Sequence, residues 1–353
     1  MKPYRHIFLF AALFILLSTS SCISRKGYTT ISGYAQGGTY SVTFNVDGVK
    51  EDSRVIRDSI DALLVKIDKS VSGYNKGSIL SKFNAGERVV PDEIFLDLYS
   101  RSREIFERTG GCVDVAGAPL YDLWGFGFSA DSLPSDEKVQ SVLNHCGMGL
   151  LVPDLRMVLA EDSSLVAQDA VLPSLKDVVV KLNFNAVAQG YSSDLVASYL
   201  RSIGVKDMLV DIGEIYCCGR NPKGMPWRIG IDAPKDGNDT PGADIQCIFA
   251  IPKDSCGVVT SGNYRKFYIK DGRKYAHTID PHTGFPVSHN LLSATVLAPD
   301  AFTADAYASY CMVLGLDKAK EFISSDPSLE GCLIYDEDGE LKTWCSAGFT
   351  LAD

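Results

Sequence analysis

A ten-residue stretch from His277 to Pro286 places a titratable ring and a carboxylate where a strand must end. It reads His-Thr-Ile-Asp-Pro-His-Thr-Gly-Phe-Pro and follows two β-prone runs joined by Asp271-Gly272, a strong hairpin signal. Its prolines and its Thr-Gly pair prevent a strand or helix from continuing. His277 can accept a proton near neutral pH, and Asp280 can orient it or hold a nearby donor. The stretch fits general-base chemistry, and it also fits a capped turn with an exposed histidine.

Two predicted helix starts carry groups that suit a phosphate and a metal ion. The stretch from Asn183 to Gly190 leads from a predicted strand into a helix start of small residues, where free N–H groups and the helix dipole favour a phosphate. Asp305 and Ser309 lie four residues apart near the start of a later helix, so they share one face. A carboxylate and a hydroxyl oxygen suit Mg²⁺, which usually takes few protein ligands. The alternatives are plain N-capping by Asn185 and stabilisation of a helix N-terminus by Asp305.

A third candidate lies in loops that are rich in aromatic residues and glycine. Tyr74 belongs to a polar, turn-rich segment, and Val113-Asp114 begin a run from Cys112 to Gly127 that has neither helical nor strand periodicity. Such a run is often a packed functional loop. An aromatic ring and a carboxylate can bracket a flat heterocycle, and they can equally belong to surface turns.

The elements that must position these residues predict an α+β chain. Apolar residues at helical spacing predict helices over residues 53–71, 91–109, 135–146, 186–203, 302–314 and 316–324. β-prone runs predict strands at 37–46, 157–159, 178–184, 206–216, 227–231, 245–251, 258–260, 263–269, 274–278, 292–298, 333–335 and 341–344. Hairpins mixed with helices, without regular βαβ alternation, favour an α+β fold. No GxGxxG follows a strand and no GxxxxGKS/T occurs, so neither a Rossmann nor a P-loop nucleotide site is indicated.

The N-terminus has the pattern of an export signal. Lys2 and Arg5 precede an apolar run, residues 7–17, that is too short to anchor in a bilayer as a spanning helix. Small residues and then Cys22 follow, which resembles a bacterial lipoprotein signal with Cys22 as the lipidated first residue; an ordinary secretory signal is the alternative. We therefore expect a signal peptide over residues 1–21, a tether over 22–33 and one domain over 34–353. The 46% hydrophobic content is ample for its core.

Charge and cysteine usage exclude some classes of function. The formal net charge is −10, and it becomes −12 once residues 1–21 are removed, which argues against a nucleic-acid partner. Ten cysteines include Cys22, and the nine that remain cannot all pair within the chain. No CxxC occurs, and most cysteines lie in apolar contexts, so we expect small core residues.

The candidate motifs, in this order, make the chain resemble the ApbE-type FAD:protein FMN transferases from about Ala35 to Gly315. The resemblance is carried by Gly37–Tyr40, Leu80–Asn84, Gly110–Asp114, Leu123–Gly127, Ala186–Tyr191, His277–Gly284 and Thr303–Ala306. It implies an α+β body related to T-folds, with antiparallel sheets, packed helices and FAD in a cleft.

The resemblance also implies roles for individual residues. The flavin nucleotide site would be lined by Gln36, Tyr74, Cys112, Val113, Asp114, Asn183, Gln189 and Thr278. The backbone carbonyl of Ala186, with Asp305 and Ser309, would hold Mg²⁺. His277 matches the histidine proposed as general base, and we assign Asp280 to the catalytic pair with it. The implied reaction transfers FMN from FAD to a threonine hydroxyl of an acceptor protein and releases AMP.

The implied acceptor is a membrane redox subunit with an Asp-Ser/Thr-Gly-Ala-Ser/Thr-like motif, and the implied location is the periplasmic side of the bacterial cell envelope, with the lipid on Cys22 as anchor. The sequence departs from the family at Asn183 and Gln189, where members often carry an Asp and a charged residue. An Mg²⁺-dependent FAD pyrophosphatase and a non-catalytic periplasmic FAD-binding lipoprotein therefore stay as alternatives, beside an exported structural domain without a ligand.

Overall fold

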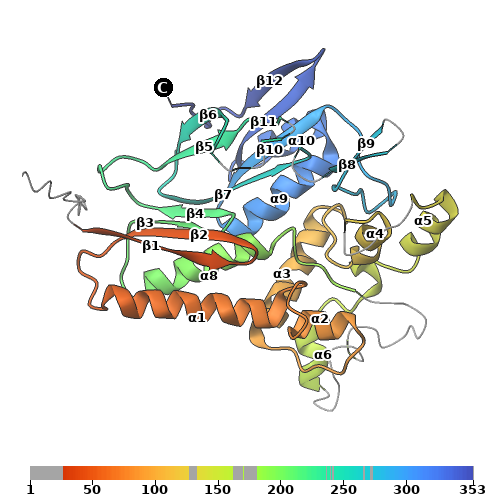
Figure 1. Cartoon of the computed structure of the whole chain (residues 1–353), viewed down its shortest axis with the longest axis horizontal. Helices are drawn as coiled ribbons and strands as arrows, with labels where there is room; N and C mark the ends of the chain where they lie inside the picture. The colour runs from red at the N-terminus through yellow and green to blue at the C-terminus, as the bar shows by residue number, and fades with distance from the viewer. Residues whose placement is uncertain are drawn as a thin grey trace, which may run out of the picture.

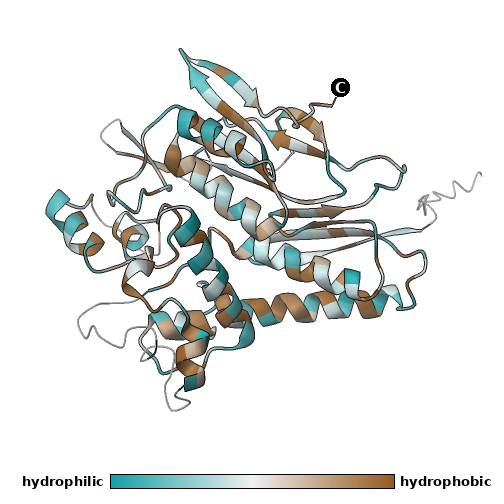
Figure 2. Ribbon diagram, turned by 180° about the vertical axis from the view of Figure 1, so that it is seen from behind, coloured by the Kyte–Doolittle hydropathy of each residue, from teal (hydrophilic) through white to brown (hydrophobic). Residues whose placement is uncertain are grey.

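An eight-stranded antiparallel sheet forms the centre of the molecule, and helices cover one of its faces (Figures 1 and 2). The computed structural model describes residues 27–126, 133–161, 170, 181–235, 237–238, 240, 242–264, 267–270 and 273–352. The predicted α+β class with antiparallel sheets is confirmed. The predictions for residues 1–26, including Cys22, and for strand residues 178–180 lie outside the described residues.

Strands far apart in the sequence are neighbours in this sheet. Its order is β1-β2-β3-β4-β7-β10-β11-β12, and every neighbouring pair is antiparallel. The strands are β1 (Tyr28–Ala35), β2 (Gly38–Asn45), β3 (Met208–Asp211), β4 (Ile215–Cys218), β7 (Ser255–Gly262), β10 (Leu291–Ala298), β11 (Glu330–Glu337) and β12 (Glu340–Cys345). Two hairpins stand apart from it: β5 (Arg228–Asp232) with β6 (Ile245–Ala250), and β8 (Phe267–Lys270) with β9 (Arg273–Ala276).

The two faces of the sheet bury different cores because successive side chains of a strand point to opposite faces. Val259 and Leu333 belong to the main core on the helical face, whereas their neighbours Val258 and Cys332 belong to a second core. This second core also takes residues of β5 and β6, so the small hairpin covers the face opposite the helices.

The helices fall into two groups. Helices α1 (Ser53–Val71), α8 (Ala188–Ser202), α9 (Ala301–Leu314) and α10 (Leu316–Ser325) pack on the sheet, and Figure 2 shows the first three running across it. The second group gathers beside the sheet (Figure 1): α2 (Ile79–Asn84), α3 (Glu93–Arg108), α4 (Ala118–Leu123), α5 (Asp136–Leu143), the short 3₁₀ turn Met148–Leu150 and α6 (Leu155–Glu161). Helix α9 is apolar on nearly all sides and lies in the interior, which suits a helix that touches both β7 and α8.

Five predictions about local structure were wrong. Residues 28–33 of the expected tether form most of β1, because β2 pairs with it in register along its whole length. Residues 157–159 lie in α6, whose first turn is capped by Asp154, and residues 181–184 are not a strand. Helix α8 begins at Ala188 rather than Ala186, and Asn185 does not cap it. The run expected to lack periodicity contains α4, with Pro119 in its first turn.

Candidate active site

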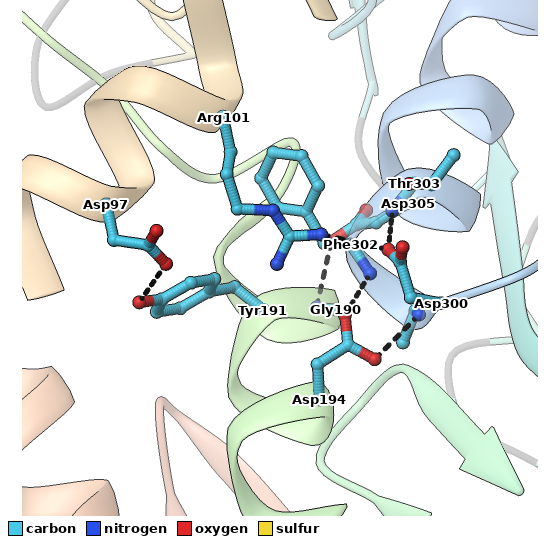
Figure 3. A network of polar contacts seen from close by, with 10 residues as sticks. Asp97, Arg101, Gly190, Tyr191, Asp194, Asp300, Phe302, Thr303 and Asp305 are labelled. Atoms are coloured by element: carbon cyan, nitrogen blue, oxygen red, sulfur yellow. Dashed lines mark hydrogen bonds and ion pairs between the residues drawn. The ribbon is translucent and has the colours of Figure 1, made fainter. Parts of the chain in front are cut away.

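Helices α8 and α9 touch at Gly190, and this contact fixes the buried carboxylate of Asp305 (Figure 3). The N–H of Gly190 donates to Asp305 Oδ2 at 3.1 Å, and Asp305 is only 5% exposed. A Cβ atom on residue 190 would lie 2.3 Å from the carbonyl oxygen of Ala301 and 2.9 Å from the Cβ of Asp305. Only glycine lets the two helices approach this closely.

Two further carboxylates hold the N-terminus of α9. Asp194 on α8 accepts hydrogen bonds from the N–H groups of Ala301 and Phe302, at 2.8 and 2.9 Å. Asp300 caps the same helix end and pairs with Arg101 of α3 at 3.1 Å. The guanidinium of Arg101 lies over the ring of Phe302, 4.0 Å from its centre. Figure 3 shows these groups converging from three helices, which orients the turn that carries Asp305.

Burial makes the negative charge of these carboxylates costly. It raises the pKa of Asp194 to about 7, with a further contribution from Asp300. Burial also raises the pKa of Asp305 well above its ordinary value, and the nearby charge of Asp194 adds to this. A cation beside Asp305 would offset that cost, so the carboxylate fits a metal ligand.

The rest of the expected Mg²⁺ site lies on the same two helices and their neighbours. Ser309 is one turn after Asp305, and its Oγ lies 3.4 Å from the Oγ of Ser261 at the end of β7. Ala186 lies two residues before α8, on the turn that leads to Gly190. No three His, Cys, Asp or Glu side chains of the described chain converge as a metal site. The donors present are thus one carboxylate with hydroxyl and backbone oxygens, a set that suits Mg²⁺ completed by phosphate and water.

A short chain of contacts connects this pair with the histidine stretch. The hydroxyl of Thr278 donates to Asn263 Oδ1 at 2.7 Å. Asn263 lies two residues after Ser261, the partner of Ser309. Two residues of extended chain span about 7 Å. The structure thus brings His277-Thr278 beside the end of β7 that faces α9.

The stretch from His277 to Gly284 is held as a rigid turn. The indole N–H of Trp124 donates to the carbonyl of Gly284 at 2.7 Å, and the ring stacks on Tyr275 of β9. The carboxylate of Asp280 accepts from the N–H of His282 at 2.9 Å and lies 3.3 Å from His282 Nδ1. The contacts of Asp280 thus brace the turn, and its predicted catalytic role stays a prediction.

Two adjoining cavities open next to these residues. The larger has a volume of about 370 Å³, within the usual range for small-molecule sites, and the smaller has about 130 Å³. They share Gly73, Tyr74 and Asn185. Asn183 lines the larger cavity, and Gln36 and Gln189 line the smaller. The ring of Phe126, another wall of the larger cavity, lies 6.4 Å from the ring of His277.

Four of the expected flavin-site residues therefore surround the two cavities, whereas Cys112, Val113 and Asp114 lie in the loop beside them. Asp114 accepts hydrogen bonds from the N–H groups of Ala116 and Met148, and burial raises its pKa. Val113 is buried, and Cys112 Sγ lies 3.8 Å from His282 Nδ1. The contacts of this loop fix its shape, and Asn183 N–H donates to the carbonyl of Val115 at 2.7 Å.

The sequence analysis missed several polar walls of the larger cavity. Lys181 and Asp122 both line it and form an ion pair at 3.0 Å, and Lys76, Ser81, Asn84 and Glu87 complete its polar lining. Ser81 and Asn84 stand in the Leu80–Asn84 motif, which carried the resemblance without an assigned role. No local pattern marks Lys181 and Asp122, because they meet only in the folded chain.

The fold and the site define an α+β protein with a small-molecule cavity beside a buried carboxylate suited to a cation. The model of the ApbE family matches residues 36–333, and the chain therefore belongs to the ApbE family. An FAD:protein FMN transferase of Escherichia coli (strain K12) is 31% identical over 350 residues, covering 97% of this chain and 95% of that protein.

A second relative and two solved structures agree with this assignment. An FAD:protein FMN transferase of Haemophilus influenzae is 31% identical over 346 residues, covering 96% of this chain and 95% of that protein. The flavin transferase ApbE from Vibrio cholerae matches with a TM-score of 0.73 and 29% identity, covering 91% of this chain and 97% of that one. The apo flavinyl transferase ApbE of Pseudomonas stutzeri gives 0.74 and 29%, covering 91% and 95%.

Proposed function

We propose that this chain is an enzyme that transfers FMN from FAD to a threonine hydroxyl of an acceptor protein, with Mg²⁺ bound and AMP released. FAD:protein FMN transferase is the activity that the names of its near-full-length relatives carry. The structural observation that carries the proposal is the placement of Asp305 and Ser309, on α9, between the α8 contact and the end of β7 next to His277-Thr278.

The residues of this chain divide the chemistry between them. Asp305, Ser309 and the Ala186 carbonyl would hold Mg²⁺, which when bound neutralises charge on phosphoryl oxygens. His277 takes the proton of the threonine hydroxyl, whose oxygen then attacks the FMN phosphorus. A phosphoester bond to the protein forms as the bond between FMN phosphate and AMP breaks, and AMP leaves with the bridging oxygen. Gln36, Tyr74, Asn183 and Gln189 hold the nucleotide in the two cavities.

We further propose that the enzyme is exported and tethered by a lipid on Cys22 to the periplasmic side of the bacterial envelope. The basic start, the apolar run and the small residues before Cys22 support this proposal. The described helices include none whose length and hydropathy would let it cross a membrane. Metabolic labelling with a radioactive fatty acid would test it, since Cys22→Ala would lose the label.

The activity is tested by incubating the chain that starts at Cys22 with FAD, Mg²⁺ and an acceptor peptide of the Asp-Ser/Thr-Gly-Ala-Ser/Thr type. We expect an FMN mass adduct on the peptide and AMP in solution. AMP and free FMN without an adduct would identify an FAD pyrophosphatase, and bound FAD without AMP would identify a binding protein.

The role of His277 is tested with His277→Ala, and His145→Ala is the matched control because His145 is an exposed histidine far along the chain from both cavities' walls. We expect His277→Ala to abolish the adduct while FAD binding survives, and His145→Ala to keep both. Loss of FAD binding together with the adduct would assign His277 to the structure of the site instead.

A further inference from the structure

Two pairs of cysteines face each other across neighbouring strands in the second core. Cys332 of β11 is directly opposite Cys345 of β12, and Cys217 of β4 is directly opposite Cys256 of β7. The sulfur atoms lie 3.4 Å apart in the first pair and 3.9 Å apart in the second. All four are free thiols in the structure. None of them belongs to the site described above.

The hydrogen-bond pattern of the sheet distinguishes the two pairs. The N–H of Ser346 donates to the carbonyl of Gly331, so the preceding pair, Cys332 and Cys345, falls at a non-hydrogen-bonded position. At such positions the side chains approach most closely, with Cα atoms about 4.5 Å apart, which lies within the range for a disulfide.

The second pair differs in this respect. The N–H of Gly219 donates to the carbonyl of Asp254, two positions along from Cys217 and Cys256. Because the two kinds of position alternate, Cys217 and Cys256 fall at a hydrogen-bonded position, where the side chains stand further apart. Both thiols are also fully buried, out of reach of a dissolved reagent.

Access and reactivity favour the first pair as well. Cys345 is partly exposed, whereas Cys332 is fully buried directly behind it. The contact with Cys332 lowers the pKa of Cys345, and it also lowers the pKa of Cys247 on β6. The thiolate is the reactive form of cysteine. A reagent would therefore meet Cys345 first, with Cys332 in position to attack next.

We propose that Cys332 and Cys345 are a redox-modification site at which a small external disulfide oxidises the two thiols to a cross-strand disulfide. The thiolate of Cys345 attacks one sulfur of glutathione disulfide, forms a mixed disulfide and expels one glutathione thiolate. Cys332 then gives up its proton and attacks Cys345 Sγ, which expels the second glutathione. Two electrons pass to glutathione, and the new bond ties β12, the edge strand of the sheet, to β11.

The test uses the full described fold as the chain that starts at Cys22, purified under reducing conditions. It is incubated with glutathione disulfide, its remaining thiols are alkylated without unfolding and again after unfolding, and its peptides are mapped by mass spectrometry. We expect one cross-linked peptide pair joining Cys332 to Cys345, removed by dithiothreitol, while Cys217 and Cys256 are recovered as alkylated thiols. Cys217→Ser is the matched control and should keep the cross-link, and Cys345→Ser should lose it.

Other outcomes would overturn the proposal. They are recovery of Cys332 and Cys345 as thiols, a glutathione adduct that stays on Cys345, equal cross-linking of Cys217 with Cys256, or a cross-link from Cys247 in place of Cys345. The wild-type map decides among these by itself, so the conclusion does not depend on whether a variant folds.

Discussion

Replacing Gly190 with alanine tests the contact on which the geometry of Asp305 depends. The added Cβ would lie 2.3 Å from the carbonyl oxygen of Ala301, where ordinary contacts begin at 3.4 Å. Helices α8 and α9 would have to separate locally by about 1 Å, in a core that is close-packed on both sides. The N–H of residue 190 would then move away from the buried carboxylate.

The magnitude follows from three terms. Overpacking a core costs about 1–3 kcal/mol. Weakening a hydrogen bond to a charged group costs about 1.5–3 kcal/mol when the bond is lost. Alanine is the better helix former by about 1 kcal/mol, which offsets part of this. We expect the free energy of unfolding of Gly190→Ala to fall by about 2–4 kcal/mol.

The assay is urea unfolding followed by tryptophan fluorescence, together with FAD binding at a temperature where the variant stays folded. Gly149→Ala is the matched control, because its Cβ would meet only the ring of Phe106 at an ordinary 3.7 Å. We expect that control to stay within about 0.5 kcal/mol of wild type. If Gly190→Ala were as stable as Gly149→Ala, the close helix contact, and with it the described placement of Asp305, would be refuted.

Three further substitutions probe the charges and the turn around the site. Burial raises the pKa of Asp194 from 3.8 to about 7, so the folded chain binds more protons than the unfolded chain in that window and its free energy of unfolding falls as pH rises to about 7. Asp194→Asn should flatten this decline in urea titrations at several pH values, and an unchanged slope would contradict the assignment. Mg²⁺ should raise the melting temperature of wild type but not of Asp305→Asn, and an equal rise in both would remove Asp305 from the metal site. Trp124→Phe leaves a buried carbonyl of the His277 turn unpaired, at about 1–3 kcal/mol, and should lower both stability and FMN transfer. Trp227→Phe loses a similar bond in the second core and should lower stability alone; equal transfer by the two variants would count against the turn's role.

The long elements could be predicted because their own side chains specify them. The predicted helix over residues 53–71 is α1, with Asp52 as its N-cap, and the apolar run predicted over 302–314 is α9 less one residue. Short elements failed because their partners are distant in the sequence. β1 is a strand because β2 pairs with it, and α6 has only seven residues, too few for a clear period.

The site divides in the same way. Residues within one local motif, such as Asp305 and Ser309, could be predicted to share a face because one helix carries both. The supporting groups could not, because Asp194 and Arg101 act on the start of α9 from two other helices. Lys181 and Asp122 are likewise 59 residues apart, and their ion pair exists only once the larger cavity has formed.

The apolar character of α9 explains how weak local signals become one site. Because the helix is buried on nearly all sides, every polar group on it must find a partner inside the protein. Asp305 meets the N–H of Gly190 on α8, and Ser309 meets Ser261 on β7, so each polar side chain points toward a different neighbouring element. Those two neighbours lead directly to the cavity wall at Gln189 and to the turn at Thr278. A charge placed on any other face of α9 would be buried without a partner, so the packing of this helix itself restricts where the cation-binding oxygens can lie.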